Sequence, residues 1–568
     1  MQAHKLLLAS FATAALCLPS AALFTETTAP VAAAPASSAF ADVPADMAAL
    51  LPADLSVVIM TKPIAELEGI ALDLAGKIMP EVAEMVSADT MLQIVGIDPA
   101  MIDHTRPLCF ALGPVSLEEE PQPFVLIPTR DGEFMRELFA GMSSMPAEMI
   151  QLRTSGNYVG MTMGPSYPEA GESRILGTVP AGLIGVSVDM VSVLDTYGPL
   201  LQIGMRMARI QMDSEMPAGM PFNMTSMLDS ALGMAEGAMD SIEEFRLSLD
   251  ITDSRLDIRE TLVVSEGSPM SGIASDRPSK LSKLLPLMRD DSINMVVGAN
   301  VGEMMTKMAP LLESLQSMYP AEMGEGLMAS MDAFQDIYSQ FGDGLVASGG
   351  FTENGMEVSM FFDGAEYDGL LAAYKGALEQ PFWGQLGMKY LETKTGKSGE
   401  VNLTRFIFEF DMEAMLASMG EELPEAEVAD LQKMMVAMYG ENLTITLAQS
   451  GGIGTMIVGG GDDLITEALG RIAAGGTTPR GFAPLTSLAN KSNPFISYSL
   501  ELGEIISGTV PMMTSALGEP PLPLEAVEGL NMPMNFYFGA SKTEWTGGIR
   551  MDLVQVGEFV QRMQGLEN

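Results

Sequence analysis

Few residues in this chain could carry acid–base chemistry, and histidine is the first to consider. His104 lies in the run Asp103-His104-Thr105-Arg106, and His4 falls in the N-terminal leader. An imidazole titrates near neutral pH and is the usual general base of a catalytic triad. No Gly-x-Ser-x-Gly nucleophile elbow occurs in the sequence to accompany it. We therefore interpret His104 as a hydrogen-bonded turn residue and predict no catalytic residues.

The possible metal ligands are methionine and carboxylate rather than histidine and cysteine. One His and Cys109 cannot build a zinc site, and Cys109 sits in a strand-like run typical of a buried thiol. The segment from Met205 to Met239 is rich in thioethers, which suit Cu(I), with four of them at helical spacing: Met212, Met216, Met220 and Met224. Pro217, Gly219 and Pro221 interrupt that spacing. We predict a mobile loop followed by a packed helix, binding no metal.

Calcium and phosphate motifs are incomplete. No EF-hand loop occurs, and Asp363-Gly364 and Asp368-Gly369 are interpreted as ordinary turns. Gly396-Lys397-Ser398 resembles the end of a phosphate loop, but Leu391 stands where the first glycine is needed. The glycine runs 451–454 and 459–461 lack dinucleotide spacing and favour a hairpin, followed by a helix capped by Asp462 or Asp463. The sequence therefore predicts no cofactor.

Acidic residues dominate the charge. The 568 residues carry 74 acids against 30 Lys and Arg, a net charge of −44. Such a surface repels phosphate backbones and anionic membranes, so nucleic acid is excluded as a partner. A hydrolase using two carboxylates stays open, because any two acids can meet in a fold. Trp383 and Trp545 are the only tryptophans, which is sparse for sugar stacking.

The N-terminus predicts export. Lys5 precedes an apolar run from Leu6 to Leu18, and Ser20-Ala21-Ala22 supplies small residues for cleavage, so residues 1–22 are typical of a signal peptide. Residues 23–42, rich in Ala, Pro and Thr, read as a flexible spacer. No later segment is apolar enough to span a membrane, which predicts a periplasmic or secreted protein without a transmembrane anchor.

Alternating and helical patterns recur along the rest of the chain. A strand is expected at 55–60 and amphipathic helices at 64–78, 133–142 and 301–318. Hairpins are expected where period-two runs flank short turns: 150–163, 245–264, 345–362 and 534–553. The segment 389–410 is expected to be strand, polar turn, strand.

These elements suggest a duplicated α+β architecture. Leu51-Pro52 and Leu285-Pro286 each precede an apolar strand and a helix, and similar hairpins close both parts. We expect two related halves, 43–275 and 276–568, each an antiparallel sheet of hairpins packed with amphipathic helices.

The opening Leu51-Pro52-Ala53-Asp54, with the strand and helix that follow, resembles uncharacterised exported bacterial proteins in which such an element starts each half. The second copy departs from it, reading Leu285-Pro286-Leu287-Met288. The resemblance implies an envelope location and a non-enzymatic role, with no known site to transfer.

Three functions remain after these exclusions. The first is a non-catalytic exported envelope protein, a scaffold or binding module of unknown ligand whose partner is an unknown envelope protein or a lipophilic ligand. The second is a carrier of lipophilic ligands, favoured by a mean hydropathy of +0.22 and by 49 methionines, whose flexible side chains line adaptable pockets. The third is the carboxylate-dependent hydrolase.

Overall fold

The computed structural model describes residues 40–78, 98–117, 120–133, 150–164, 166–215, 241–275, 280–300, 303, 336–337, 339–352, 355–364, 366–378, 383, 388–412, 425–476, 478–479, 492–517 and 532–567. The predicted signal peptide and most of the predicted spacer lie outside these ranges. Just beyond the first boundary, the Ala41 amide donates a hydrogen bond of 2.8 Å to the Val179 carbonyl.

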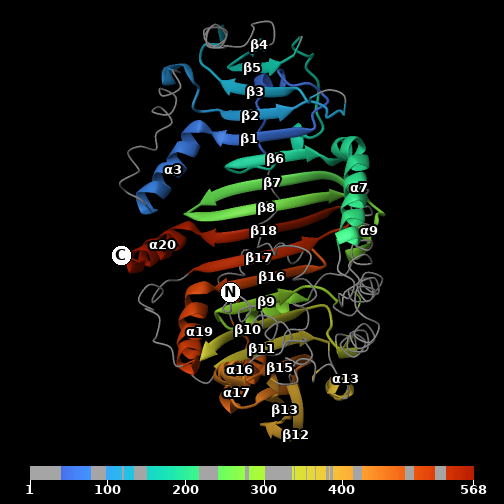
Figure 1. Ribbon diagram of the computed structural model, residues 1–568, viewed down its shortest axis with the longest axis vertical. Coiled ribbons are helices and arrows are strands. Elements are labelled where there is room, and N and C mark those ends of the chain that lie inside the picture. Colours follow the sequence, from blue (N-terminus) through green and yellow to red (C-terminus); the bar gives the residue numbers. More distant parts are fainter. Residues whose placement is uncertain are drawn as a thin grey trace.

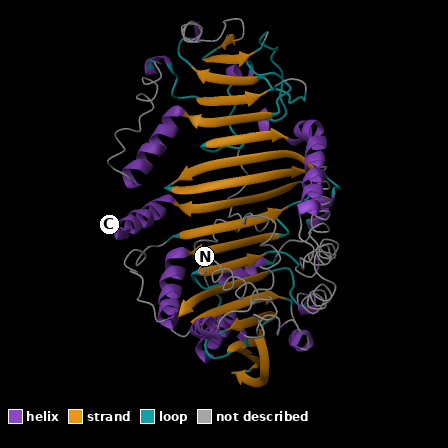
Figure 2. Ribbon diagram, in the orientation of Figure 1, coloured by secondary structure: helices purple, strands orange, loops and turns teal. Residues whose placement is uncertain are grey.

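One antiparallel sheet contains all eighteen strands of the described residues (Figures 1 and 2). From one edge to the other the strands are β4 (Ile150–Ser155), β5 (Tyr158–Met163), β3 (Pro123–Pro128), β2 (Pro107–Leu112), β1 (Val57–Pro63), β6 (Ile184–Asp189), β7 (Ile242–Thr252), β8 (Arg255–Val264), β18 (Glu544–Asp552), β17 (Pro533–Ala540), β16 (Phe495–Glu501), β9 (Ile293–Val297), β10 (Leu345–Thr352), β11 (Gly355–Asp363), β15 (Ile453–Val458), β14 (Leu443–Ser450), β13 (Val401–Phe410) and β12 (Met388–Ser398).

Helices flank this sheet. They are α2 (Ala45–Ala48), α3 (Ile64–Ile78), α7 (Met190–Glu215), α9 (Pro269–Ile273), α10 (Leu281–Leu284), α13 (Tyr367–Leu378), α16 (Glu425–Tyr439), α17 (Asp462–Ala474), α19 (Leu502–Leu517) and α20 (Leu553–Glu567), with short 3₁₀ turns η2 (Pro99–Met101), η3 (Leu176–Thr178) and η4 (Leu285–Leu287). In Figure 1, α3, α20 and α19 lie along one set of strand ends, and α7 lies along the other.

The expected fold class, two α+β halves, is wrong. The strands form one continuous sheet, because β8 and β18 pair across the expected boundary between 275 and 276, with Ile258 opposite Ile549. The physical reason is that an edge strand presents unpaired backbone N–H and C=O groups, which favour pairing with another strand. Periodicity predicts a strand but not this distant partner.

The local elements agree with the sequence patterns. The four predicted hairpins are present as β4–β5, β7–β8, β10–β11 and β17–β18, and β12–β13 forms the expected strand, turn and strand. Asp253 and Ser254 turn the β7–β8 hairpin with positive φ angles of 50° and 66°, as a tight two-residue turn requires. The helix at 64–78 is α3, whereas the first strand starts at Val57 rather than 55. The helices expected at 133–142 and 301–318 lie almost wholly outside the described residues.

The sheet is covered differently along its length. Over β9–β11 and β13–β15, apolar side chains are buried on both faces, beneath Leu370 of α13 and Tyr439 of α16 on one side and beneath α10, η4 and α17 on the other. At the other end, one face of β1–β3 and β5 packs against Met47, Leu50 and Leu51. Between these two ends, Tyr537 of β17 belongs to the cluster beneath α10, η4 and α17, and Phe536 and Ile549 pack against it. The strands β6, β7 and β8 contribute to none of these clusters, and they lie in the middle of the candidate site.

Candidate binding face

The residues singled out for acid–base chemistry lie in a turn held by ion pairs. His104 precedes β2, and its carbonyl accepts a hydrogen bond of 2.9 Å from the Ala65 amide. Beside it, Arg106 Nη1 lies 2.8 Å from Asp46 Oδ2 and Arg106 Nε lies 3.2 Å from Asp103 Oδ2. Burial raises the pKa of Asp46, but hydrogen bonds from Asn157 and Arg106 outweigh it and hold that pKa below its usual value. The cluster joins the N-terminal segment to the sheet.

Cys109 lies on β2 with 2% of its surface exposed. Burial raises the pKa of its thiol to about 12. The thiolate, which is the nucleophilic form, is therefore disfavoured at neutral pH. The structure places this residue where an inert core thiol belongs.

The phosphate-like and calcium-like motifs occupy ordinary elements. Residues 396–398 end β12 next to the turn glycine Gly399, and residues 451–454 lie in the β14–β15 hairpin. Gly461 is the N-cap of α17, so Asp462 and Asp463 belong to its first turn rather than to its cap. Asp363-Gly364 is a turn, but Asp368-Gly369 lies inside α13, which corrects that prediction.

The methionine-rich segment is only partly described. Met205 to Glu215 are helical, within α7, where a loop was expected, so that part of the prediction is wrong. Residues 216–239 lie outside the described residues. Throughout the described part of the chain, no group of three or more His, Cys, Asp and Glu residues could hold a metal ion.

Three carboxyl groups near the start of α19 have raised pKa values. Burial raises the pKa of Asp291 although Arg289 Nε lies 2.7 Å away. Burial also raises the pKa of Glu501, which accepts a hydrogen bond from the Met532 amide, and that of Glu504. Asp291 and Glu501 are engaged with an arginine and with backbone, which favours a structural role over hydrolysis.

The central strands bury polar residues on one face. On β7, Glu244, Arg246 and Ser248 are 3%, 8% and 5% exposed. Arg246 Nη2 donates to Glu244 Oε2 at 2.9 Å, and Ser187 Oγ donates to Glu244 Oε1 at 2.5 Å. Burial raises the pKa of Glu244, but the hydrogen bonds from Arg246, Ser187 and Thr178 outweigh it and lower that pKa below its usual value. Each buried charge thus has its partner, as burial requires.

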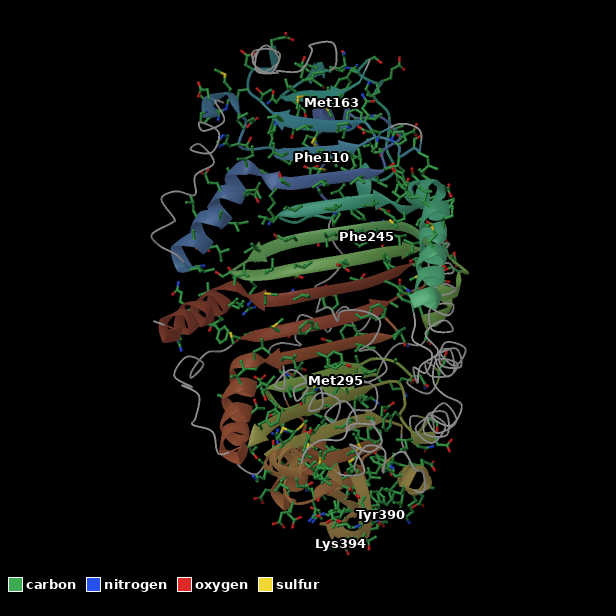
Figure 3. The ribbon with its side chains drawn as sticks, in the orientation of Figure 1. Phe110, Met163, Phe245, Met295, Tyr390 and Lys394 are labelled. Carbon is green, nitrogen blue, oxygen red and sulfur yellow. The ribbon has the colours of Figure 1, made fainter. Side chains whose placement is uncertain are left out.

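The opposite face of the same strands is apolar and half-exposed. Pairing places its side chains on one side of nine neighbouring strands: Met161 and Met163, Val125, Phe110 and Leu112, Val57 and Ile59, Ile184, Val186 and Val188, Phe245, Leu247, Leu249 and Ile251, Leu256, Ile258 and Leu262, Trp545, Ile549 and Met551, Met534, Phe536 and Phe538. We call this set the apolar face. Every member is half-buried or exposed, and Figure 3 labels Met163, Phe110 and Phe245 along it.

This arrangement inverts the usual one. Soluble antiparallel sheets normally bury their apolar face and leave the polar face in water. Met163, Ile184 and Phe110 are instead 47%, 38% and 36% exposed. Glu260 is the charged exception among the paired positions of the central strands. Nine strands about 4.8 Å apart give a surface about 38 Å long. Only Met163, Ile184 and Phe110 are exposed and the other members are half-buried, and a long apolar surface that stays partly exposed is a candidate interaction site.

Two helices border the apolar face. Ile64, at the start of α3, packs with Val159 and Ile102 over one end, and a Cβ added to Gly508 of α19 would contact Phe351 on β10. Both contacts are on the side of the sheet that the apolar face occupies. Beyond Ile64, α3 buries no residue fully. Its partner α20 approaches it where Gly557 lies against Ile78.

Trp545 gives the apolar face one polar atom. Its ring packs edge-on against Phe538, with centroids 5.4 Å apart. The indole Nε1 is buried and has no hydrogen-bond partner. Buried tryptophan N–H groups usually find an acceptor, so this donor is an exception.

The sequence shows the alternation that produces the apolar face, but it does not predict that this face stays partly exposed. The period-two runs of β7, β8, β17 and β18 predict hairpins with one apolar face, but alternation does not show what covers that face. No protein-family model, no curated protein and no solved structure matches this chain. Among the described residues, no helix is both long and apolar enough to cross a bilayer.

Proposed function

We propose that this chain is a non-catalytic, exported binding protein that carries a lipophilic ligand on its apolar face. The observation that carries the proposal is the half-buried apolar face of β1–β3, β5–β8, β17 and β18, which lies opposite buried polar residues on β6–β8. Export rests on residues 1–22, which have the pattern of a signal peptide.

The chemistry of the face favours an apolar small molecule over a protein partner. Protein interfaces are enriched in Arg and carry about one hydrogen bond per 100–200 Å². Here the surface is aliphatic, aromatic and methionine-rich, and its central strands are hydrogen-bonded on both sides, leaving few donors. Sites for small apolar molecules are lined predominantly by hydrophobic and aromatic side chains, as this face is.

Net charge argues against a membrane as the occupant. With a charge of −44, the protein is repelled by anionic lipid surfaces. A single amphiphile with one or two acyl chains avoids that repulsion and gains from apolar burial. The ligand class we infer is therefore a free lipid or similar amphiphile.

The test uses tryptophan fluorescence, because Trp383 and Trp545 are the only tryptophans. Trp383 is 6% exposed, in the core, and its Nε1 donates to the Ala377 carbonyl at 2.9 Å. The uncharged probe N-phenyl-1-naphthylamine should bind the protein and quench Trp545 by energy transfer, and palmitate should displace it. Quenching should persist in the Trp383→Phe variant and disappear in the Trp545→Phe variant.

Absence of probe binding at saturating concentration would overturn the proposal. Quenching of Trp383 alone, retained in Trp545→Phe, would also reject it, because the ligand would then bind elsewhere. Native mass spectrometry after mild extraction gives an independent check, and a protein that is free of lipid and takes up none argues for a scaffold.

A further inference from the structure

A single carboxylate stands in the middle of the apolar face. Glu260 lies on β8, directly opposite Leu247 of β7 and Gly547 of β18. Strands β8 and β18 run side by side through the middle of the sheet (Figure 1). The side chain of Glu260 is exposed, whereas Ile258 and Leu262, its neighbours on the same face of β8, are half-buried. A ligand that covers the central part of the apolar face therefore meets the Glu260 carboxylate.

The cations of the neighbouring strands do not neutralise Glu260. Strand alternation places the described arginines of β7, β8 and β18 on the opposite face of the sheet: Arg246, Arg255, Arg259 and Arg550. On that face Arg246 Nη2 lies 2.9 Å from Glu244 Oε2, and Arg550 Nη2 donates to Asp257 Oδ2 at 2.6 Å. Within the described part of the chain, the Glu260 carboxylate consequently has no ion-pair partner.

The position of Glu260 restricts what can bind around it. A neutral or anionic group laid over this carboxylate would remove its water and give no counter-charge in return, which is unfavourable. A cationic group supplies the missing counter-charge at the same place. The charge of the ligand is therefore set by a residue of the apolar face itself.

Aromatic side chains flank the same position. Gly547 contributes no side chain, and Phe538 of β17 pairs with it on the far side from Glu260. Trp545 precedes Gly547 by two residues on the same face of β18, and its ring packs edge-on against Phe538 with centroids 5.4 Å apart. Trp545 is thus the diagonal neighbour of Glu260, at about 7–8 Å, within reach of aromatic and long side chains. A carboxylate beside aromatic rings is a combination that attracts ammonium groups, through an ion pair and a cation–π contact.

We infer that Glu260 and Trp545 bind the cationic head group of an alkylammonium amphiphile, whose apolar tail lies along the apolar face. This inference rests on the proposed function, because it assigns the head group of the ligand carried there. The head group lies over Gly547, between the Glu260 carboxylate and the aromatic rings. The net charge of −44 acts in the same direction, since the field of the whole protein attracts cations and repels anions.

The experiment compares two amphiphiles of equal chain length and opposite charge, hexadecyltrimethylammonium and palmitate. Each is titrated, below the concentration at which it forms micelles, against bound N-phenyl-1-naphthylamine. The ammonium compound should displace the probe at a concentration about tenfold lower than palmitate. Glu260→Gln should weaken the ammonium compound about fivefold and leave the affinity for the uncharged probe unchanged. Glu260→Lys should reverse the order, so that palmitate binds more tightly.

Glu266→Gln is the matched control. Glu266 is exposed in the turn that follows β8, and its replacement changes the net charge by the same amount as Glu260→Gln. The preference for the ammonium compound should persist in this control. An equal loss of preference in both variants would show that only the net charge matters, and it would overturn the inference.

Two other results would also reject the assignment. One is an unchanged order of the two amphiphiles in Glu260→Gln and Glu260→Lys. The other is self-association of Glu260→Gln with its preference intact, which would make Glu260 a charge that prevents pairing between copies of the chain. Binding of the uncharged probe to the wild type tests the proposed function separately, so a protein that binds the probe without preferring the ammonium compound rejects this inference alone.

Discussion

Replacing Phe110 with serine is the most direct test of the apolar face. Phe110 is 36% exposed on β2. A phenylalanine presents on the order of 200 Å², so about 70 Å² remain for a ligand to cover. At about 25 cal/mol per Å², this contact contributes about 1.8 kcal/mol, which corresponds to roughly 20-fold in the dissociation constant. We expect Phe110→Ser to weaken binding of N-phenyl-1-naphthylamine by that order.

Leu391→Ser is the matched control. Leu391 is 44% exposed on β12, at the opposite end of the sheet, where Figure 3 labels its neighbour Tyr390. Both substitutions remove a partly exposed apolar side chain, so both should lower the free energy of unfolding. Only Phe110→Ser should weaken the probe, measured by fluorescence titration at a temperature where both variants are folded. Equal affinities in the two variants would refute the assignment of the ligand to the apolar face.

Three further predictions concern stability and reactivity. Arg246→Met should lower the free energy of unfolding by about 3–5 kcal/mol in urea titrations, because it leaves the Glu244 carboxylate buried without its main partner. Adding Glu244→Leu should restore most of this loss. If the losses of the two substitutions simply add, this account is wrong. Because the pKa of Glu244 is lower in the folded state than in the unfolded state, ionised Glu244 stabilises the folded protein at pH values above the unfolded pKa of about 4.3. This stabilisation should be lost as the pH falls through the folded pKa. The free energy of unfolding of the wild type and of the double variant, measured over a series of pH values, tests this. Cys109 should resist a thiol reagent at pH 8 until urea unfolds the chain, and rapid labelling of the native protein would show that the thiol is not buried.

Much of the local structure was determined by the sequence alone. Alternating residues such as Phe245, Leu247 and Leu249 identify β7, and the turn at Asp253 follows from the short polar gap between two such runs. The α3 helix follows from apolar residues at 3.6-residue spacing. These signals are local because side-chain direction repeats with a fixed period in each element. Sequence patterns also excluded a phosphate-binding loop at Gly396, and the structure places this residue on β12.

The tertiary structure decided which strands meet and which face is covered. Asp257 and Arg550 are 293 residues apart. The sequence of either strand does not specify the strand with which it pairs, because the backbone hydrogen bonds of a sheet are the same for every sequence. Alternation shows that β7 has one apolar and one polar face, and burial on folding normally selects the apolar one. Here the polar face is enclosed, with Glu244 and Arg246 satisfying each other, while Phe245 stays half-exposed. That choice depends on what packs over each face, a non-local property that residue periodicity does not contain.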